Sequence, residues 1–139
     1  MSGARIKCFD TCIVVFQRRE TWEDAEAVCK ARGGHLFVPE TSEQESSVST
    51  YLEAVYSNGR DTNFWIGGQI LETNQEQWLS DRVVNYPYLW GITKPTATDE
   101  PLCIAMDPTK SFRWTAYSCN NPSFFLCEEK TPYESRIFG

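Results

Sequence analysis

Six cysteines constrain the fold of this 139-residue chain more than any other feature of its sequence. They are Cys8, Cys12, Cys29, Cys103, Cys119 and Cys127. An even number of cysteines in a short chain predicts a disulfide framework and therefore an oxidising, extracellular environment. The alternative is a cytosolic protein that keeps all six thiols reduced. Six cysteines can pair in many ways, so the count alone does not set the connectivity.

The composition is that of one acidic, folded domain. A hydrophobic content of 41% with 14% aromatic residues excludes a disordered chain. The net charge of −6 argues against a nucleic-acid partner, because nucleic acids attract basic surfaces. No apolar run approaches the roughly 20 residues of a membrane span, so we expect no membrane insertion by this segment. Its first residues lack the apolar region of a signal peptide, so we expect any signal or anchor to lie outside it.

The first part of the chain predicts a strand followed by a helix. Residues 13–16 are a short run of β-branched and aromatic residues, which is typical of a strand. Thr21, with Asp24 three residues later, can cap the next helix. Gly33 and Gly34 are expected to end this helix.

A second helix is predicted after a brief strand at residues 36–38. Ser42 and Glu45 have the spacing of a capping box at its start. The apolar residues that follow recur at i, i+3, i+4 and i+7, which is the pattern of an amphipathic helix. They are Val48, Tyr51, Leu52 and Val55.

The second half of the chain predicts short strands and one long loop. The expected strands lie at residues 64–68, 77–79, 102–106, 112–115 and 124–127. Between Trp78 and Cys103 the sequence is rich in turn-forming and aromatic residues, and a long loop of this kind in a compact domain is usually functional. The predicted fold class is α+β, with two helices packed on small antiparallel sheets and a long irregular loop.

Several independent landmarks follow one another along the chain, beginning with the segment Thr-Trp-Glu-Asp-Ala-Glu-Ala-Val-Cys at residues 21–29. The others are Gly33-Gly34-His35-Leu36, Trp65-Ile66-Gly67-Gly68, Cys103, Trp114, Cys119 and Phe124-Phe125-Leu126-Cys127-Glu128. This order and spacing resembles a C-type lectin-like domain. We therefore expect an N-terminal extension at residues 1–7, the domain at residues 8–129 and a C-terminal tail at residues 130–139.

The resemblance implies two disulfides, Cys29–Cys127 and Cys103–Cys119. The second of these, with the strands around it, would anchor the long loop on rigid elements. Cys8 and Cys12 are separated by only three residues, which departs from the usual family pattern. We expect a local Cys8–Cys12 bridge, and the alternative is an intermolecular disulfide that would give a homodimer.

The residues that hold calcium in sugar-binding members of this family are replaced here. The family uses an acid-Pro-amide triplet and a Trp-Asn-Asp triplet, which align with residues 94–96 (Lys-Pro-Thr) and 114–116 (Trp-Thr-Ala). Calcium takes about six to eight oxygen ligands, whereas a lysine carries the wrong charge and no acceptor. The resemblance therefore implies a member that lacks the calcium and sugar triplets and needs no cofactor.

Other acids offer a weaker basis for a metal site. Asp99 and Glu100 could supply the remaining family acid, but two carboxylates without partners make a poor calcium site, so we treat them as loop acids. Some family members bind a structural ion near the second helix, and Glu43, Glu45 and Glu128 are the candidates here. We interpret Glu45 as a helix-capping residue, and we predict no metal ligands.

The sequence offers no catalytic constellation. His35 is the only histidine, and it precedes a short strand, where a structural or surface role is the usual one. No metalloprotease, nucleophile-elbow or phosphate-loop motif is present in the sequence. We therefore predict that the protein is not an enzyme.

These observations favour an extracellular recognition module that binds a protein ligand without calcium, through the long loop and the strand beside it. The alternative is a carbohydrate-binding lectin with a non-standard or residual calcium site. Tyr, Trp and Arg are enriched at protein interfaces. We expect Lys94 to pair with Asp99 or Glu100 in place of the metal. The candidate ligand-binding residues are Tyr88, Trp90, Lys94, Thr96, Asp99, Glu100, Arg113, Thr115 and Tyr117.

Overall fold

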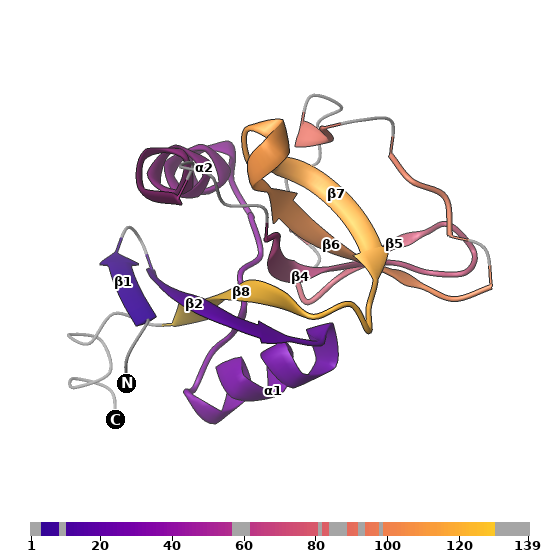
Figure 1. The fold of residues 1–139 in the computed structure, drawn as a ribbon, viewed down its shortest axis with the longest axis horizontal. Helices are drawn as coiled ribbons and strands as arrows, with labels where there is room; N and C mark the ends of the chain where they lie inside the picture. Colours follow the sequence, from indigo (N-terminus) through magenta and orange to yellow (C-terminus); the bar gives the residue numbers. More distant parts are fainter. Residues whose placement is uncertain are drawn as a thin grey trace.

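The computed structural model of the protein describes residues 4–8, 11–56, 62–80, 82–83, 89–91, 94–97 and 99–129, with side chains from Cys8 onward. Two α-helices, α1 (Trp22–Ala31) and α2 (Ser42–Tyr56), lie on different sides of a central sheet (Figure 1). The strands are β1 (Ala4–Cys8), β2 (Cys12–Glu20), β3 (His35–Leu36), β4 (Phe64–Ile70), β5 (Glu76–Trp78), β6 (Leu102–Asp107), β7 (Arg113–Ser118) and β8 (Ser123–Glu129). A 3-10 helix, η2 (Pro108–Lys110), joins β6 to β7.

The strands form one connected sheet in the order β1-β2-β8-β4-β6-β7, with β3 paired to β8 and β5 paired to β4. The predicted α+β class with two helices is confirmed. The expectation of several small antiparallel sheets differs from the structure, because β8 pairs with β2 on one side and, in parallel, with β4 on the other. Phe16 and Phe125, which are partners in the β2–β8 register, stack at 4.8 Å.

Helix α1 begins as its sequence predicts. The hydroxyl Oγ1 of Thr21 accepts a hydrogen bond from the backbone N–H of Asp24 at 3.2 Å, which satisfies one of the free donors of the first turn. Trp22, Ala25 and Cys29 are buried on one face at helical spacing. The indole N–H of Trp22 donates to the carbonyl of Ile66 in β4 at 2.8 Å, so α1 is fixed against the sheet.

Helix α2 begins differently from the prediction. Thr41, and not Ser42, caps it, because Thr41 Oγ1 accepts from the backbone N–H of Gln44 at 3.0 Å. The prediction of a capping box formed by Ser42 and Glu45 is therefore wrong. Glu45 lies one helical turn before the buried Val48 and is itself buried, so its side chain faces the interior.

All three disulfides are intramolecular. The implied Cys29–Cys127 and Cys103–Cys119 bridges are present, and the local Cys8–Cys12 bridge is confirmed. Cys8 and Cys12 face each other across the β1–β2 hairpin. Strand β1 includes residues 4–7, for which the sequence predicted only an extension.

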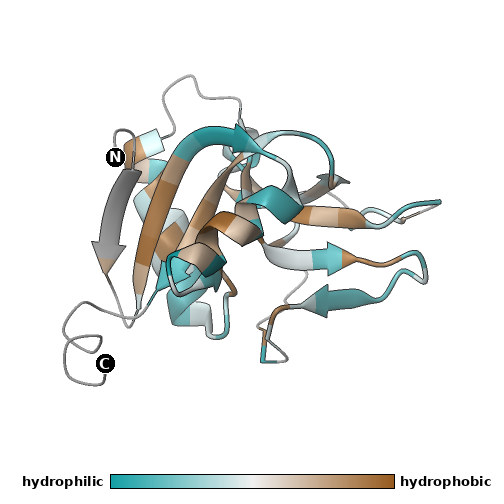
Figure 2. Ribbon diagram, turned by 90° about the horizontal axis from the view of Figure 1, so that it is seen from below, coloured by the Kyte–Doolittle hydropathy of each residue, from teal (hydrophilic) through white to brown (hydrophobic). Residues whose placement is uncertain are grey.

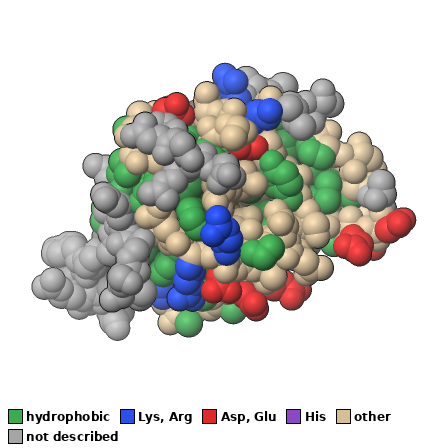
Figure 3. Space-filling model, in the orientation of Figure 1, with side chains coloured by type: hydrophobic (Ala, Val, Ile, Leu, Met, Phe, Trp, Pro, Cys, Tyr) green, Lys and Arg blue, Asp and Glu red, His purple; other side chains and the backbone are tan. Residues whose placement is uncertain are grey.

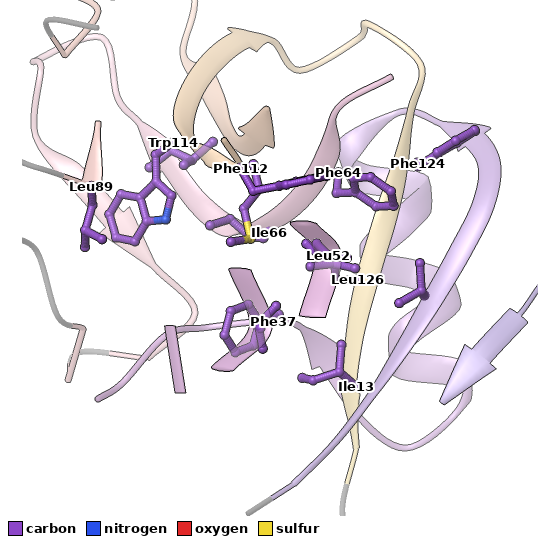
Figure 4. Packing of buried hydrophobic residues seen from close by; sticks show 14 of the residues in the cluster. Ile13, Phe37, Leu52, Phe64, Ile66, Leu89, Phe112, Trp114, Phe124 and Leu126 are labelled. Atoms are coloured by element: carbon purple, nitrogen blue, oxygen red, sulfur yellow. The ribbon is translucent and has the colours of Figure 1, made fainter. Parts of the chain in front are cut away.

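The apolar residues fill two clusters on the two faces of the sheet. One lies under α1 and contains both cysteines of the Cys29–Cys127 bridge. The larger one lies under α2 and reaches the long loop at Leu89 and Trp90 (Figure 4). Hydrophobic colours accordingly follow the central strands (Figure 2). None of the described helices is long and apolar enough to cross a membrane.

Candidate functional site

The described part of the long loop is held against the β4–β5 hairpin by side chains. Lys94 Nζ donates to Glu76 Oε2 at 2.8 Å, and Glu76 Oε1 accepts from the indole N–H of Trp78 at 3.1 Å. The backbone N–H of Ala97 donates to Asn74 Oδ1 at 2.8 Å. Two points of the described loop are therefore tied to one hairpin by side-chain contacts.

The partner of Lys94 differs from the one predicted. The sequence suggested Asp99 or Glu100, but the structure pairs Lys94 with Glu76 in β5. The Glu76 side chain is only 10% exposed, whereas that of Lys94 is 41% exposed. Asp99 and Glu100 are exposed, as is Thr96. The loop thus presents solvent-accessible acids beside a lysine whose charge is already paired.

Two candidate residues lie in the interior. Trp90 is 8% exposed and packs edge-to-face on Trp114 at 5.7 Å, and the backbone N–H of Gly91 donates to the Trp114 carbonyl at 2.9 Å. Thr115 is 3% exposed. Because both side chains are buried, we do not carry Trp90 and Thr115 forward as direct ligand contacts. Tyr88 lies outside the described residues.

Arg113 and Tyr117 occupy opposite ends of β7. Tyr117 is half-buried, and its hydroxyl donates to Asp107 Oδ2 at 3.0 Å; burial, followed by this interaction with Asp107, raises the pKa of its phenol. Arg113 is exposed and pairs in register with Asp107. Glu76 lies at the other end of the sheet, opposite Ile70 in β4. Along β6, Asp107 beside Arg113 and Leu102 beside Ile70 are five residues apart, which is about 17 Å of strand. Arg113 and the Lys94–Glu76 pair therefore do not form one compact patch.

The acids considered for a structural ion do not gather at one point. Glu128 accepts from the backbone N–H of Val38 at 3.0 Å and from Thr11 Oγ1 at 3.1 Å. Burial raises the pKa of Glu128, while the Val38 N–H and the nearby His35 lower it. Glu45 instead faces the core under α2. Among the described residues, no three His, Cys, Asp or Glu side chains are placed to hold a metal ion.

From the sequence, Glu45 was considered only as a possible ion ligand or helix-capping residue, and its place in a cavity was not predicted. It lines a cavity of about 240 Å³ between α2 and the start of β7. Burial raises the pKa of its carboxyl to about 7, and the nearby Trp114 side chain lowers it. The Trp114 indole N–H does not reach full hydrogen-bond geometry in this arrangement. The sequence does contain a signal for the burial of Glu45, because this residue lies at helical spacing on the same face as Val48 and Leu52.

On the face of the molecule shown in Figure 3, no single sign of charge covers the described surface. Figure 3 shows basic and acidic side chains interspersed over one face of the molecule. This mixture agrees with the modest acidic net charge of −6.

A family model for the lectin C-type domain matches residues 18–129. The chain belongs to the C-type lectin family. Human lithostathine has the same fold, with a TM-score of 0.74 and 26% identity over 94% of this chain and 99% of that one. A structure of a calcium-independent type II antifreeze protein shares the fold at a TM-score of 0.70 and 23% identity, covering 94% of this chain and 93% of that one.

Two curated relatives also match most of the chain in sequence. One of them is a polypeptide of the snaclec coagulation factor IX/factor X-binding protein of Echis carinatus, which is 30% identical over 84% of this chain and 90% of its own length. Lithostathine-1-alpha of Homo sapiens is 28% identical over 86% of this chain and 72% of its own length. The family comprises non-enzymatic binding proteins, in agreement with the prediction that this C-type lectin-like chain is not an enzyme.

Proposed function

We propose that this C-type lectin-like domain is an extracellular recognition module that binds a protein ligand, independently of calcium, through the exposed part of its long loop. The observation that carries the proposal is the Lys94–Glu76 ion pair. Lys94 aligns with a metal-binding acid of sugar-binding members, and here its ammonium ties the loop to β5. Protein groups thus supply an anchor of the kind that an ion supplies in those members.

The recognition surface we propose is formed by Lys94, Thr96, Asp99 and Glu100, which are all exposed. A loop that rests on a disulfide-bonded sheet can present such residues in a fixed geometry, which favours precise binding. The name of the snaclec relative states that it binds coagulation factors IX and X, which supports a protein as the ligand class. The three disulfides support an extracellular location. The domain limits at residues 8 and 129 stay a prediction.

Thermal melting with and without calcium tests the metal independence. We expect the melting temperature to agree within about 1 °C in excess calcium and in excess chelator, because only an ion that binds the native state stabilises it. A calcium-dependent rise of several degrees would contradict the proposal.

Binding assays test the ligand class. We expect a blank glycan array and chelator-resistant binding within a panel of purified secreted proteins that includes factors IX and X. Lys94→Glu should abolish that binding with little loss of fold, whereas Lys30→Glu, on the exposed face of α1, should leave it unchanged. Array binding that survives chelator but fails in high salt would favour the carbohydrate-binding alternative. Gel filtration in the same buffer determines whether the protein is a homodimer.

A further inference from the structure

A second site, separate from the long-loop surface, lies where α2 faces η2 and the start of β7 (Figure 1). Its cavity has a volume of about 240 Å³. Glu45, Ser46 and Ser49 line it from the helix, and Leu89, Phe112 and Arg113 line it from the other side. This volume is below the range of roughly 300 to 1,000 Å³ that is usual for drug-sized ligands, so it suits one side chain.

The cavity contains a buried carboxyl group. Glu45 is 6% exposed, and none of the ion pairs formed among the described residues involves it. Removing a carboxylate from water is costly unless a charged or hydrogen-bonding partner replaces the water. Within the described surroundings, Trp114 and Arg113 are the polar side chains of β7 nearest to this end of α2, and Arg113 extends into solvent. A cationic group of a ligand would therefore form its most favourable interaction with the Glu45 carboxylate.

We propose that this cavity is a binding site for the alkylammonium group of a lysine side chain. An ammonium carries three donors and no acceptor, and the cavity offers one carboxylate together with the hydroxyls of Ser46 and Ser49. The aliphatic stem fits the apolar wall formed by Leu89 and Phe112, two members of the core cluster that lie on either side of Trp114 in Figure 4.

Other ligand classes fit the lining less well. A calcium ion requires several hard oxygen ligands, and Glu45 is the only carboxylate among the residues that line the cavity. A phosphate or carboxylate would meet Arg113 at the rim but would be repelled by the buried Glu45. The proposal does not depend on the long-loop function, because it concerns different residues at the opposite end of the sheet.

The test is a titration of the whole chain with Nα-acetyl-lysine methylamide, followed by the backbone amide resonances of Leu89 and Phe112. The matched probe is Nα-acetyl-norleucine methylamide, which keeps the stem and lacks the ammonium. We expect the lysine probe to bind at least about tenfold more tightly than the norleucine probe. Equal affinities, or no shift at Leu89 and Phe112, would overturn the proposal.

Variants identify the groups responsible. Glu45→Gln keeps the shape and removes the charge, so it should weaken the lysine probe at least about tenfold. Glu53→Gln, an exposed acid of the same helix, should have no effect. Arg113→Ala should strengthen binding, because it removes a like charge from the rim. A loss of affinity in Arg113→Ala would instead indicate an anionic or zwitterionic ligand. An arginine probe that binds more tightly than the lysine probe would also contradict the assignment.

The pH dependence gives an independent readout. Glu45 is the only carboxyl group among the residues that line the cavity, Arg113 is the other charged side chain there, and the lysine probe titrates only near pH 10. We therefore assign a change of affinity between pH 6 and 8 to Glu45. Affinity for the lysine probe should therefore rise by about tenfold from pH 6 to pH 8. The Glu45→Gln variant should show a flat profile. If that variant fails to fold, the two probes on the unaltered chain still decide the outcome.

Discussion

Lys94 Nζ lies 2.8 Å from Glu76 Oε2, which joins the long loop to a strand 18 residues earlier in the chain. The acceptor carboxylate is largely buried, and its second oxygen accepts a hydrogen bond from Trp78. The ion pair is therefore part of a small network and is less exposed than a typical surface pair. Such a network can hold the loop in place while leaving the neighbouring Asp99 and Glu100 accessible to a ligand.

We predict a modest coupling energy between Lys94 and Glu76. The lysine side chain is 41% exposed, so solvent screens the pair and its contribution should be only about 0.2 to 1 kcal/mol. A double-mutant cycle with Lys94→Met and Glu76→Gln, measured by urea denaturation, gives this energy. It should decrease in 1 M salt. A coupling of zero at low salt would show that the contact does not stabilise the loop.

The two long-range disulfides should contribute unequally to stability. Cys29–Cys127 joins residues 98 apart and Cys103–Cys119 joins residues 16 apart. In the chain-entropy model the longer loop contributes about 4 to 5 kcal/mol and the shorter one about 3 kcal/mol. Paired Cys→Ala variants in equilibrium urea denaturation should therefore differ by about 1 to 2 kcal/mol. Equal losses would indicate that packing of the buried sulfurs outweighs loop closure.

Much of the fold follows from periodicity and spacing in the sequence. The apolar residues of α1 and α2 recur at helical spacing, and the brief β-branched and aromatic runs became β2, β4 and β8. The family landmarks implied the long-range disulfides because they place the cysteines on elements of known topology. Strand β1 could not be predicted, because a short edge strand carries little periodic signal and is defined by its pairing with β2.

The site was less predictable because it depends on contacts between distant segments. Lys94 has acids near it in sequence at Asp99 and Glu100, yet the folded loop brings it to Glu76. Tryptophan is a residue type enriched at interfaces, but the loop places the ring of Trp90 against Trp114 in the core. In both cases the outcome is set by how the loop returns to the sheet, which local sequence patterns do not encode.

Glu45 should make the stability of the protein depend on pH. Burial raises its pKa from the ordinary value of 4.5 to about 7, so the native state retains a proton that the unfolded chain has already lost between these values. The free energy of unfolding therefore falls as the pH rises from about 4.5 to 7, and it is highest where both states are protonated. The loss relative to Glu45→Gln should be at most about 3 kcal/mol.

The measurement is the urea midpoint of the unaltered chain and of Glu45→Gln at pH 4, 5.5, 7 and 8. The difference between the two proteins isolates Glu45 from the other buried acids, among them Glu128, whose pKa is also raised by burial. Glu53→Gln serves as the exposed control on α2 and should show no such trend. A difference that is constant with pH would show that Glu45 ionises normally.

The two glycines after α1 should respond differently to substitution, because they are required for different reasons. Gly33 has a φ of +87° and open space around it, so Gly33→Ala should cost about 1 to 2 kcal/mol through backbone strain. Gly33→Asn should cost less, since asparagine tolerates this conformation better than alanine. A Cβ at Gly34 would collide with the backbone carbonyl of Glu128 in β8.

The Gly34 contact joins the end of α1 to the last strand, beside the Cys29–Cys127 bridge. Because backbone cannot move aside as a side chain can, Gly34→Ala should cost about 3 kcal/mol or more, and asparagine should give no relief. Urea denaturation of the four single variants, with Ala or Asn at Gly33 or Gly34, separates strain from collision. If Gly34→Ala were no more costly than Gly33→Ala, the close approach of the segment between α1 and β3 to β8 would not be needed for stability.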